Sequence, residues 1–396
     1  MATPDDVILT LNAGSSSLRF GLFCAGPKPE TRLRGQIESI IPGHTPRWRI
    51  DPSPADAPPD LDGVDDPVTA LGVLCGWLEA RGDLQRVRAV GHRVVHGGDR
   101  AAPAPIDKLL LRELETLSPL APLHQHQCLA AIRALRERLP DRLQVACFDT
   151  AFHHDLPPVA RRLPIPDSAA SRSLRRYGFH GLSYASVRER LPRYAPDARK
   201  VIIAHLGSGS SLCALLDGRS VETSMGMTPL DGVPMATRSG SIDPGVLLWL
   251  LTHQGFDASS LGELLYRQSG LRGISGATGD MRTLLASADP GARAAVESFV
   301  YQTARTLAGL VVPLGGLDAV VFTGGIGEHA AAIRAGIIER CRWLGLTVDT
   351  AANAAHGPRI SMKGATVSVW VIATDEEETI ARETSRLLAK QSARSP

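Results

Sequence analysis

The chain has 396 residues, and its 43 basic side chains nearly balance its 41 acidic ones, so the formal net charge at pH 7 is +2. An even balance without a basic stripe argues against a nucleic-acid-binding protein. The length favours two or three domains, each large enough to bury its own core. The most apolar late stretch, residues 307–321, contains Pro313 and Gly315, so it predicts a helix end and a strand, not a membrane span.

The cysteines and the start of the chain indicate where the protein works. The six cysteines are scattered and form no CxxC pair, which is typical of reduced thiols that fill the core of a cytoplasmic protein. The first strand-like run begins at Val7, which leaves no room for a signal peptide. We therefore expect a cytoplasmic protein that acts neither on nucleic acid nor at a membrane.

Strand-like and helical patterns alternate along the first part of the chain, which predicts an α/β unit. Strands are expected over residues 7–11, 18–24, 86–91 and 143–148, and helices over 68–82, 106–118 and 125–138. The Pro- and Asp-rich residues 40–66 are expected to form loops and edge structure.

A second α/β unit is expected to begin near Ala151. Its predicted strands are residues 200–206, 211–217, 317–323 and 367–373, and its predicted helices are 183–192, 245–255, 292–312 and 328–340. A last helix over 377–391 carries Ile380, Leu387 and Leu388 on one face, which suits packing on the first unit.

Two segments 194 residues apart repeat one layout. Residues 7–18 and 201–212 are each an apolar run, a corner of glycine and serine, and the start of a second apolar run. This pattern predicts a β-hairpin whose tight turn offers backbone N–H groups and hydroxyls to an anion. Two such hairpins predict two related domains that bind one polyanionic ligand.

Two arginines lie beside small residues. Arg93 follows a predicted strand within Gly91–Gly98, at the end of the strand where α/β proteins bind ligands. Arg238 lies within Met235–Gly240. A guanidinium can grip a carboxylate or phosphate with two hydrogen bonds. The alternative for each is an ordinary surface arginine beside a turn.

A carboxylate and a histidine are further candidates. Asp149 ends an apolar strand, where it could bind Mg²⁺, accept a proton or cap the next helix. His180 lies between Phe179 and Gly181 and is either functional or a structural histidine. The His-rich pairs near 124 and 153 lack further ligands at metal spacing, which argues against zinc.

A glycine-rich strand-to-helix turn, Thr323–Glu328, suits a nucleotide phosphate. The chain contains no GxxxxGK[ST] motif and no GxGxxG in its first unit, which excludes a P-loop enzyme and argues against a dinucleotide dehydrogenase. The acidic run Thr374–Glu378 either complements the dipole of the last helix or ligates Mg²⁺. Together these parts are those of a phosphoryl-transfer enzyme.

The chain resembles the acetate kinase family through motifs that occur in one order along nearly its whole length. They are Asn12–Ser17, Gly91–Gly98, Ala121–His124, Phe148–His153, Tyr177–Gly181, Thr223–Gly226, Thr237–Gly240, Gly325–Glu328 and Ile380–Thr384. The resemblance implies an α/β fold of two duplicated actin-like (ribonuclease H-like) domains, each a mixed sheet flanked by helices, with the active site in the interdomain cleft. The domains would be 1–149 with a C-terminal helix over 378–396, and the nucleotide-binding domain 150–377.

The resemblance further implies a homodimer that transfers the γ-phosphoryl group of ATP to acetate reversibly, with Mg²⁺ or Mn²⁺, and so handles ATP, ADP, acetate and acetyl phosphate. The catalytic residues would be Arg93, His180, Arg238, Asp149 and His124, and Asn12 and Glu376 would hold the metal. Asp149 would orient Arg93 or the metal's waters, since a carboxylate nucleophile is already ionised near pH 7.

The substrate and nucleotide residues also follow from the resemblance. Acetate would contact Arg93 and an apolar pocket of Val95, Leu123, Phe179 and Pro229. The nucleotide would contact Ser15, Ser17, Arg19, His205, Leu206, Gly207, Ser208, Gly209, Asp280, Met281, Arg282, Gly325, Ile326, Gly327, Glu328 and His329. Val95 leaves little space beyond a methyl group, so propionate is expected to be a poorer substrate.

The chain departs from the family at several positions. The family has Lys at Arg19, Asn at Ser208 and His329, Asp at Ser241, Asn-Pro at 125–126, and Thr-Ser-His where this chain has Leu182-Ser183-Tyr184. These departures bear on nucleotide affinity and on the phosphoryl donor, and they leave the carboxylate-side residues untouched. The alternatives to an acetate kinase are a propionate or butyrate kinase, an enzyme with another phosphoryl donor such as pyrophosphate, and a non-catalytic ATPase-fold switch.

Overall fold

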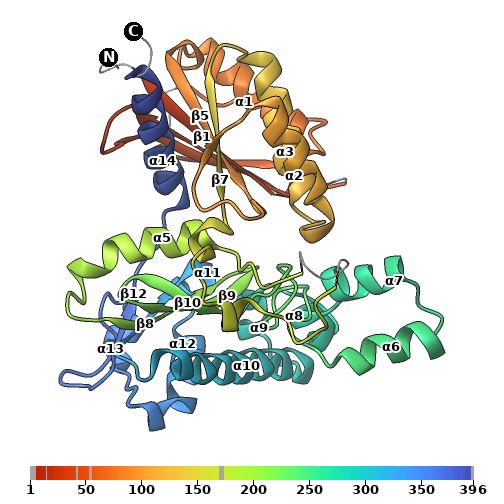
Figure 1. The fold of residues 1–396 in the computed structure, drawn as a ribbon, viewed down its shortest axis with the longest axis vertical. Helices are drawn as coiled ribbons and strands as arrows, with labels where there is room; N and C mark the ends of the chain where they lie inside the picture. Colours follow the sequence, from red (N-terminus) through yellow and green to blue (C-terminus); the bar gives the residue numbers. More distant parts are fainter. Residues whose placement is uncertain (1–5, 15, 42, 53–55, 169–173, 394–396) are drawn as a thin grey trace. The chain divides into compact units, whose positions relative to one another are not determined.

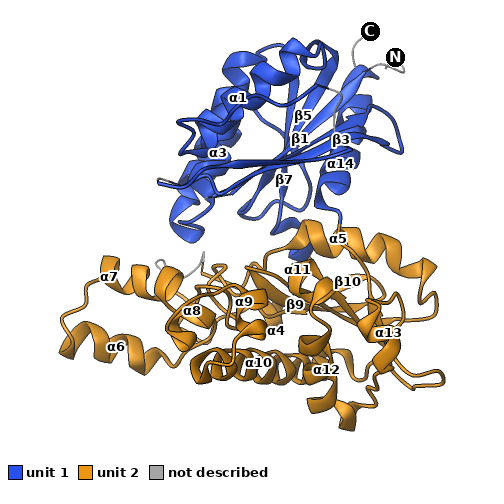
Figure 2. Ribbon diagram, turned by 180° about the vertical axis from the view of Figure 1, so that it is seen from behind, with its two compact units in different colours: residues 1–154, 375–396 blue, residues 155–374 orange. Residues whose placement is uncertain are grey.

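The computed structural model describes residues 6–14, 16–41, 43–52, 56–168 and 174–393. The chain divides into two compact units, residues 1–154 with 375–396 and residues 155–374 (Figure 2). The unit boundary therefore lies at 154/155, and the last helix belongs to the first unit.

In the part of unit 1 that is described, a mixed sheet of seven strands has the order β4-β3-β2-β1-β5-β7-β6. The strands are β1 (Val7–Ala13), β2 (Leu18–Cys24), β3 (Thr31–Glu38), β4 (Arg47–Asp51), β5 (Val87–Val94), β6 (Ala104–Pro105) and β7 (Leu143–Phe148). β1 and β2 form the predicted hairpin, and β1, β5 and β7 run parallel. The carboxyl ends of these three strands therefore lie at one edge of the sheet.

Helices cover both faces of this sheet (Figure 1). They are α1 (Pro67–Ala80), α2 (Lys108–Thr116), α3 (Gln125–Arg138) and α14 (Glu376–Ser392). Alternation along β1 sends Leu9 and Leu11 into the core with α1 and α3, whereas Ile8 packs with Ala381 of α14. The predicted packing of the last helix on the first unit is confirmed.

Unit 2 repeats the strand order of unit 1. The order β10-β9-β8-β11-β12 matches β3-β2-β1-β5-β7, with an antiparallel hairpin followed by parallel neighbours. The strands are β8 (Lys200–Leu206), β9 (Ser210–Leu216), β10 (Arg219–Thr223), β11 (Ala319–Thr323) and β12 (Ser368–Val371). The repeated layout in the sequence therefore corresponds to a repeated sheet.

The long helix α10 (Pro290–Leu314) and helix α12 (Ala331–Arg340) cover one face of this second sheet, and α5 (Gly181–Arg190) lies on the other (Figure 1). Asp289 caps α10 by accepting from Gly291 N and Ala292 N. The remaining α-helices among the described residues of the unit are α4 (Pro158–Arg161), α6 (Pro244–His253), α7 (Ala258–Glu263), α8 (Gly270–Ser275), α9 (Met281–Ala286), α11 (Gly324–His329) and α13 (Thr350–Ala354).

The structure corrects several expected elements. The strands β3 and β10 were not predicted. Asp217 and Gly218, which precede β10, both have positive φ, as the tight turn of a hairpin requires. The single helix expected over 328–340 is two helices, because the backbone leaves helical geometry at Ala330. Five short helices were also missed, because each has six residues or fewer and is too short to show a clear helical period in the sequence; they are α4, α7, α8, α9 and α13.

In the described part of the chain, no helix is both long and apolar enough to cross a membrane.

Candidate functional site

The predicted residues of unit 1 gather where β1, β5 and β7 end. Arg93 lies near the end of β5, and Asp149 directly follows β7. Arg93 donates to Asp149 Oδ2 through Nε at 3.1 Å and Nη2 at 2.6 Å. Its Nη1 donates to Asn12 Oδ1 at 3.1 Å, and Asn12 Nδ2 donates to Glu376 Oε2 at 3.3 Å. Four predicted residues thus form one hydrogen-bonded chain.

Burial sets the electrostatics of this cluster. Asp149 is 1% exposed, and burial raises its pKa to about 6 while the neighbouring Arg93 opposes that rise. Burial lowers the pKa of Arg93, but the charges of Asp149 and Glu376 outweigh this and raise it above its ordinary value. Arg93 is therefore a permanent cation whose guanidinium is oriented by a buried carboxylate.

Each predicted metal ligand carries an oxygen of the kind that suits Mg²⁺, although Asn12 Oδ1 here accepts from Arg93 and Asn12 Nδ2 faces Glu376. Asn12 and Glu376 offer an amide and a carboxylate side by side, and Asp149 Oδ1 is buried with no hydrogen-bond partner among the described residues. Nowhere in the described part of the chain do three or more His, Cys, Asp or Glu side chains lie close enough together to hold a metal ion. Mg²⁺ commonly takes one or two protein ligands and completes its shell with phosphate and water, so this donor set fits it.

The other predicted residues of unit 1 lie nearby in the fold. Val95 directly follows β5 and is buried, and His124 occupies the N-cap position of α3 without capping the helix through its side chain. Gln125, where the family pattern has Asn, accepts from His96 N at 3.1 Å and donates to His96 O at 3.0 Å. This buried amide ties the loop after Val95 to α3.

The turn of the first hairpin is closed by Gly14 N, which donates to Ser17 O at 2.8 Å. Ser15, a predicted nucleotide contact, lies outside the described residues. Arg19 faces Asn12 across the hairpin, is exposed, and donates to Gln36 at 3.1 Å.

In unit 2 the second hairpin brings Arg238 and His180 together. A Cβ atom added to Gly209 would lie 2.6 Å from Arg238 Nη2 and 3.2 Å from His180 Nε2. Both side chains therefore converge on the backbone of Gly209, where only glycine leaves them room. Arg238 also donates to Pro229 O at 2.7 Å, which fixes its guanidinium beside a predicted substrate residue.

His180 is held in an unusual position just before α5. Its φ is +59°, a left-handed conformation that is uncommon for residues other than glycine. Its Nδ1 lies 2.8 Å from Ser211 Oγ, and its ring stacks on that of His205 with 4.3 Å between centroids. The strained backbone and the two side-chain contacts direct the imidazole toward Gly209.

The glycine-rich turn lies beside the second hairpin, because β8 and β11 are parallel neighbours. A Cβ atom on Gly207 would lie 3.9 Å from Gly325 N, and one on Gly324 would lie 2.8 Å from Leu206 O. Glu328 Oε1 accepts from Gly324 N at 2.9 Å and from Thr374 N at 3.3 Å, so this side chain closes the turn. The predicted nucleotide contacts of the two turns thus adjoin.

The remaining predicted nucleotide residues have mixed surroundings. Asp280 caps α9 by accepting from Thr283 N, and Arg282 is largely exposed. Met281 belongs to the core, and the ring of His329 lies edge-on to His356 with centroids 6.0 Å apart.

A buried arginine that the sequence did not single out supports the same turn. Arg334 is fully buried on α12 and donates to Gly327 O at 2.8 Å and Glu328 O at 2.9 Å. It also binds the side-chain and backbone oxygens of Asn353. Burial lowers the pKa of Arg334 to about 10, which leaves it charged at neutral pH.

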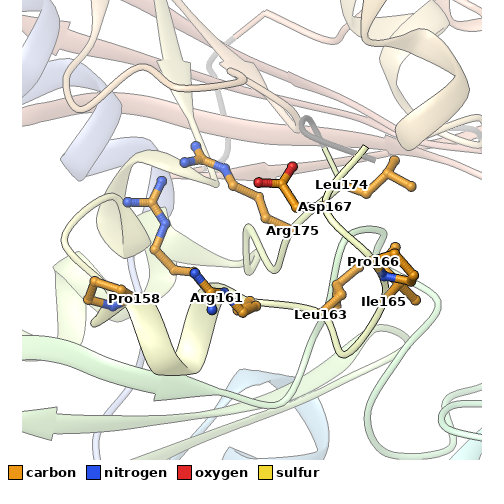
Figure 3. Close-up of a pocket in the computed structure, with 9 residues that line it drawn as sticks. Pro158, Arg161, Leu163, Ile165, Pro166, Asp167, Leu174 and Arg175 are labelled. Carbon is orange, nitrogen blue, oxygen red and sulfur yellow. The ribbon is translucent and has the colours of Figure 1, made fainter. Parts of the chain in front are cut away.

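A separate basic cavity of about 570 Å³ lies elsewhere in unit 2 (Figure 3). Arg161, Arg162 and Arg175 line it together with one carboxylate, Asp167. The Arg175 guanidinium lies 4.6 Å from the ring centroid of Tyr177. Among the described residues, none of those predicted to be catalytic or to bind substrate or nucleotide lines this cavity.

Comparison with known proteins gives a consistent result. The model of the Acetokinase family matches residues 7–382. An acetate kinase from Rhodopseudomonas palustris (strain TIE-1) is 47% identical over 96% of this chain and 98% of its own length. An acetate kinase from Rhizobium meliloti is 44% identical over 98% of this chain and 100% of its own.

Two solved structures share the fold. A propionate kinase from Francisella tularensis subsp. tularensis SCHU S4 has a TM-score of 0.89 and 35% identity, and covers 96% of this chain and 99% of its own. An acetate kinase from Porphyromonas gingivalis has a TM-score of 0.82 and 30% identity, over 97% of this chain and 100% of its own. The predicted α/β fold class is confirmed.

Proposed function

Since the chain belongs to the acetokinase family and is thus a phosphotransferase, we propose that it transfers the γ-phosphoryl group of ATP to acetate, giving acetyl phosphate and ADP. The observation that carries this proposal is the convergence of Arg238 and His180 on Gly209, beside the glycine-rich turn. Fixed cationic and hydrogen-bonding groups are what in-line phosphoryl transfer requires, since positioning and charge neutralisation supply most of its catalysis.

Arg93 and Arg238 would bind the acetate carboxylate and the transferring phosphoryl group. His180 would donate a hydrogen bond to an equatorial phosphoryl oxygen, and His124 would assist. Because acetate is already ionised near pH 7, its oxygen can attack phosphorus without a general base. The two hydrogen bonds from Arg93 to Asp149 support an orienting role for this carboxylate.

Asn12 and Glu376 would hold Mg²⁺, or Mn²⁺ in its place, and the bound ion would neutralise charge on the phosphates. The nucleotide would lie along the second hairpin and the glycine-rich turn, where backbone N–H groups are available to phosphate oxygens. The reverse reaction, from acetyl phosphate and ADP, would use the same groups, because both directions pass through the same transition state.

A propionate kinase is the second candidate, favoured by the likeness to the Francisella tularensis protein. The two are separated by kcat/KM for acetate, propionate and butyrate with Mg-ATP, measured by trapping the acyl phosphate as its hydroxamate. Acetate is expected to be the best substrate. A ratio that favours propionate would mean that the protein is a propionate kinase. If none of the three acids gave an acyl phosphate, the proposal would be refuted.

The Val95→Ala variant tests the acid pocket. Removing two methyl groups should improve the use of propionate relative to acetate by about 10-fold, since one methylene is worth roughly 1–3 kcal/mol of discrimination. The ratio of the two kcat/KM values measures this, with Val312→Ala, an exposed valine on α10, as the matched control. An unchanged ratio would remove Val95 from the pocket.

We also propose that the protein is a cytoplasmic homodimer that pairs through α6. This helix is strongly apolar, yet none of its residues is buried within the chain; Leu248 is 64% and Trp249 51% exposed. An apolar helix face of this kind is typical of a subunit interface. The six cysteines are free thiols, which suits the cytoplasm.

Replacing Leu248 and Trp249 together by glutamate should convert the dimer to a monomer, because two charges would be buried unpaired at the interface. Light scattering after size-exclusion chromatography gives the mass. The control is Leu109→Glu, which changes a 65% exposed leucine on α2 and should leave the dimer intact. A double variant that remains dimeric would show that α6 is not the interface.

A further inference from the structure

Two hydroxyl groups connect α5 and β9 to the imidazole of His180. Tyr184 Oη lies 2.5 Å from Ser211 Oγ, and Ser211 Oγ lies 2.8 Å from His180 Nδ1. Tyr184 and Ser211 are fully buried, and His180 is 9% exposed. Tyr184 stands where the family pattern has a histidine.

The three groups can form a relay of hydrogen bonds that runs from Tyr184 through Ser211 to His180. Burial raises the pKa of Tyr184 well above its ordinary value, so the phenol keeps its proton and can donate to Ser211 Oγ. Ser211, having accepted that bond, has its own hydroxyl proton free to donate to His180 Nδ1. A ring nitrogen that accepts a hydrogen bond carries no proton, so the proton of a neutral imidazole must then be on Nε2.

Resting on the function proposed above, we infer that Tyr184 and Ser211 are positioning residues that hold His180 as a neutral imidazole with its proton on Nε2. Nε2 is the atom that faces Gly209 next to Arg238. It is therefore presented as a donor at the place where the phosphoryl oxygens would be bound. The opposite tautomer would offer a lone pair to those anionic oxygens and repel them.

The surroundings of the ring favour the neutral form. The Arg238 guanidinium approaches from one side, and a second positive charge beside it would be unfavourable. On another side the ring stacks on His205, whose Nδ1 lies 2.8 Å from Ser183 Oγ. A hydroxyl thus contacts the Nδ1 atom of each of the two stacked histidines.

The test is ¹H–¹⁵N correlation NMR of the full-length protein with ¹⁵N-labelled histidine, with His180 identified by its loss in His180→Gln. The wild type should show a protonated Nε2 and an unprotonated Nδ1. Ser211→Ala and Tyr184→Phe should each yield a mixture of tautomers. In the same variants kcat should fall by about 10- to 100-fold, as for other partners that orient a functional histidine, with little change in the KM for ATP.

A conservative variant makes the test specific. Ser211→Thr keeps the hydroxyl, so it should keep the wild-type tautomer and most of kcat. Tyr301→Phe, which alters an exposed tyrosine on α10, is the control for loss of a phenol and should change nothing. An unchanged His180 spectrum in both Ser211→Ala and Tyr184→Phe would overturn the inference. If the wild type phosphorylates no carboxylate, the proposed function fails, and the spectrum still decides the tautomer.

Discussion

Replacing Arg93 by alanine is expected to lower kcat/KM for acetate by about 1000-fold, because one fixed donor to the transition state is worth roughly 10²- to 10³-fold and Arg93 supplies charge as well. The free energy of unfolding should also fall, by roughly 3–5 kcal/mol, since the 1% exposed Asp149 would lose the cation that compensates its burial. Steady-state kinetics and urea denaturation measure the two effects separately.

The double variant Arg93→Ala/Asp149→Asn separates catalysis from stability. Asparagine removes the buried charge, so much of the lost stability should return while kcat/KM stays low. Arg93→Lys should keep the positive charge but lose the paired hydrogen bonds to Asp149, and so recover part of the activity. Near-normal turnover in Arg93→Ala would contradict the assignment of this residue to the carboxylate or the phosphoryl group.

A methyl group at Gly209 should have the second large effect. The Gly209→Ala variant places an atom 2.6 Å from Arg238 Nη2 and 3.2 Å from His180 Nε2, so both groups must move. A displacement of about 1 Å at a catalytic site can cost roughly 100-fold, and we expect kcat to fall by at least that factor. Because the displaced atoms are the ends of side chains, the free energy of unfolding should change by less than about 1 kcal/mol.

Gly309→Ala is the matched control for this substitution. A Cβ atom at Gly309 on α10 meets no other atom within 4 Å, so the variant should retain full activity and gain a little stability from its higher helix propensity. Thermal unfolding and kcat with saturating acetate and Mg-ATP are measured for both variants. If Gly209→Ala turns over normally, Arg238 and His180 do not need their present positions for phosphoryl transfer.

The two hairpins could be predicted because their pattern is local: β1–β2 and β8–β9 are apolar runs joined directly by Gly/Ser turns. The strand β3 was missed because its outer positions are polar and only Leu33 and Ile37 are buried, which leaves a weak alternation. Similarly, β10 has five residues and a register shift after Ser220. Short edge strands depend on a neighbour for their hydrogen bonds, and their own sequence carries little of that information.

The residues of the candidate site also fall into those that could be predicted from the sequence and those that could not. The motifs around Arg93, His180 and Arg238 pointed to these residues, since glycines and strand ends are visible in a sequence. The partner that orients His180 was not visible, because Ser211 reaches that histidine through tertiary folding, across 31 positions of the sequence. The contact of Arg238 and His180 with Gly209 could not be predicted either, because it depends on where the fold places Arg238.

The return of α14 to unit 1 has a consequence for synthesis on the ribosome. Ile380 and Thr384 of this helix pack directly over Gly91 of β5, and Ala381 packs with Ile8 of β1. One face of the sheet of unit 1 therefore stays uncovered until residues 155–374 and then α14 have been translated. Domains usually complete their folding from the N-terminus onward. Here residues 155–374 are all available before α14 emerges, so unit 2 can reach its final packing before unit 1, although the strands of unit 1 are translated earlier.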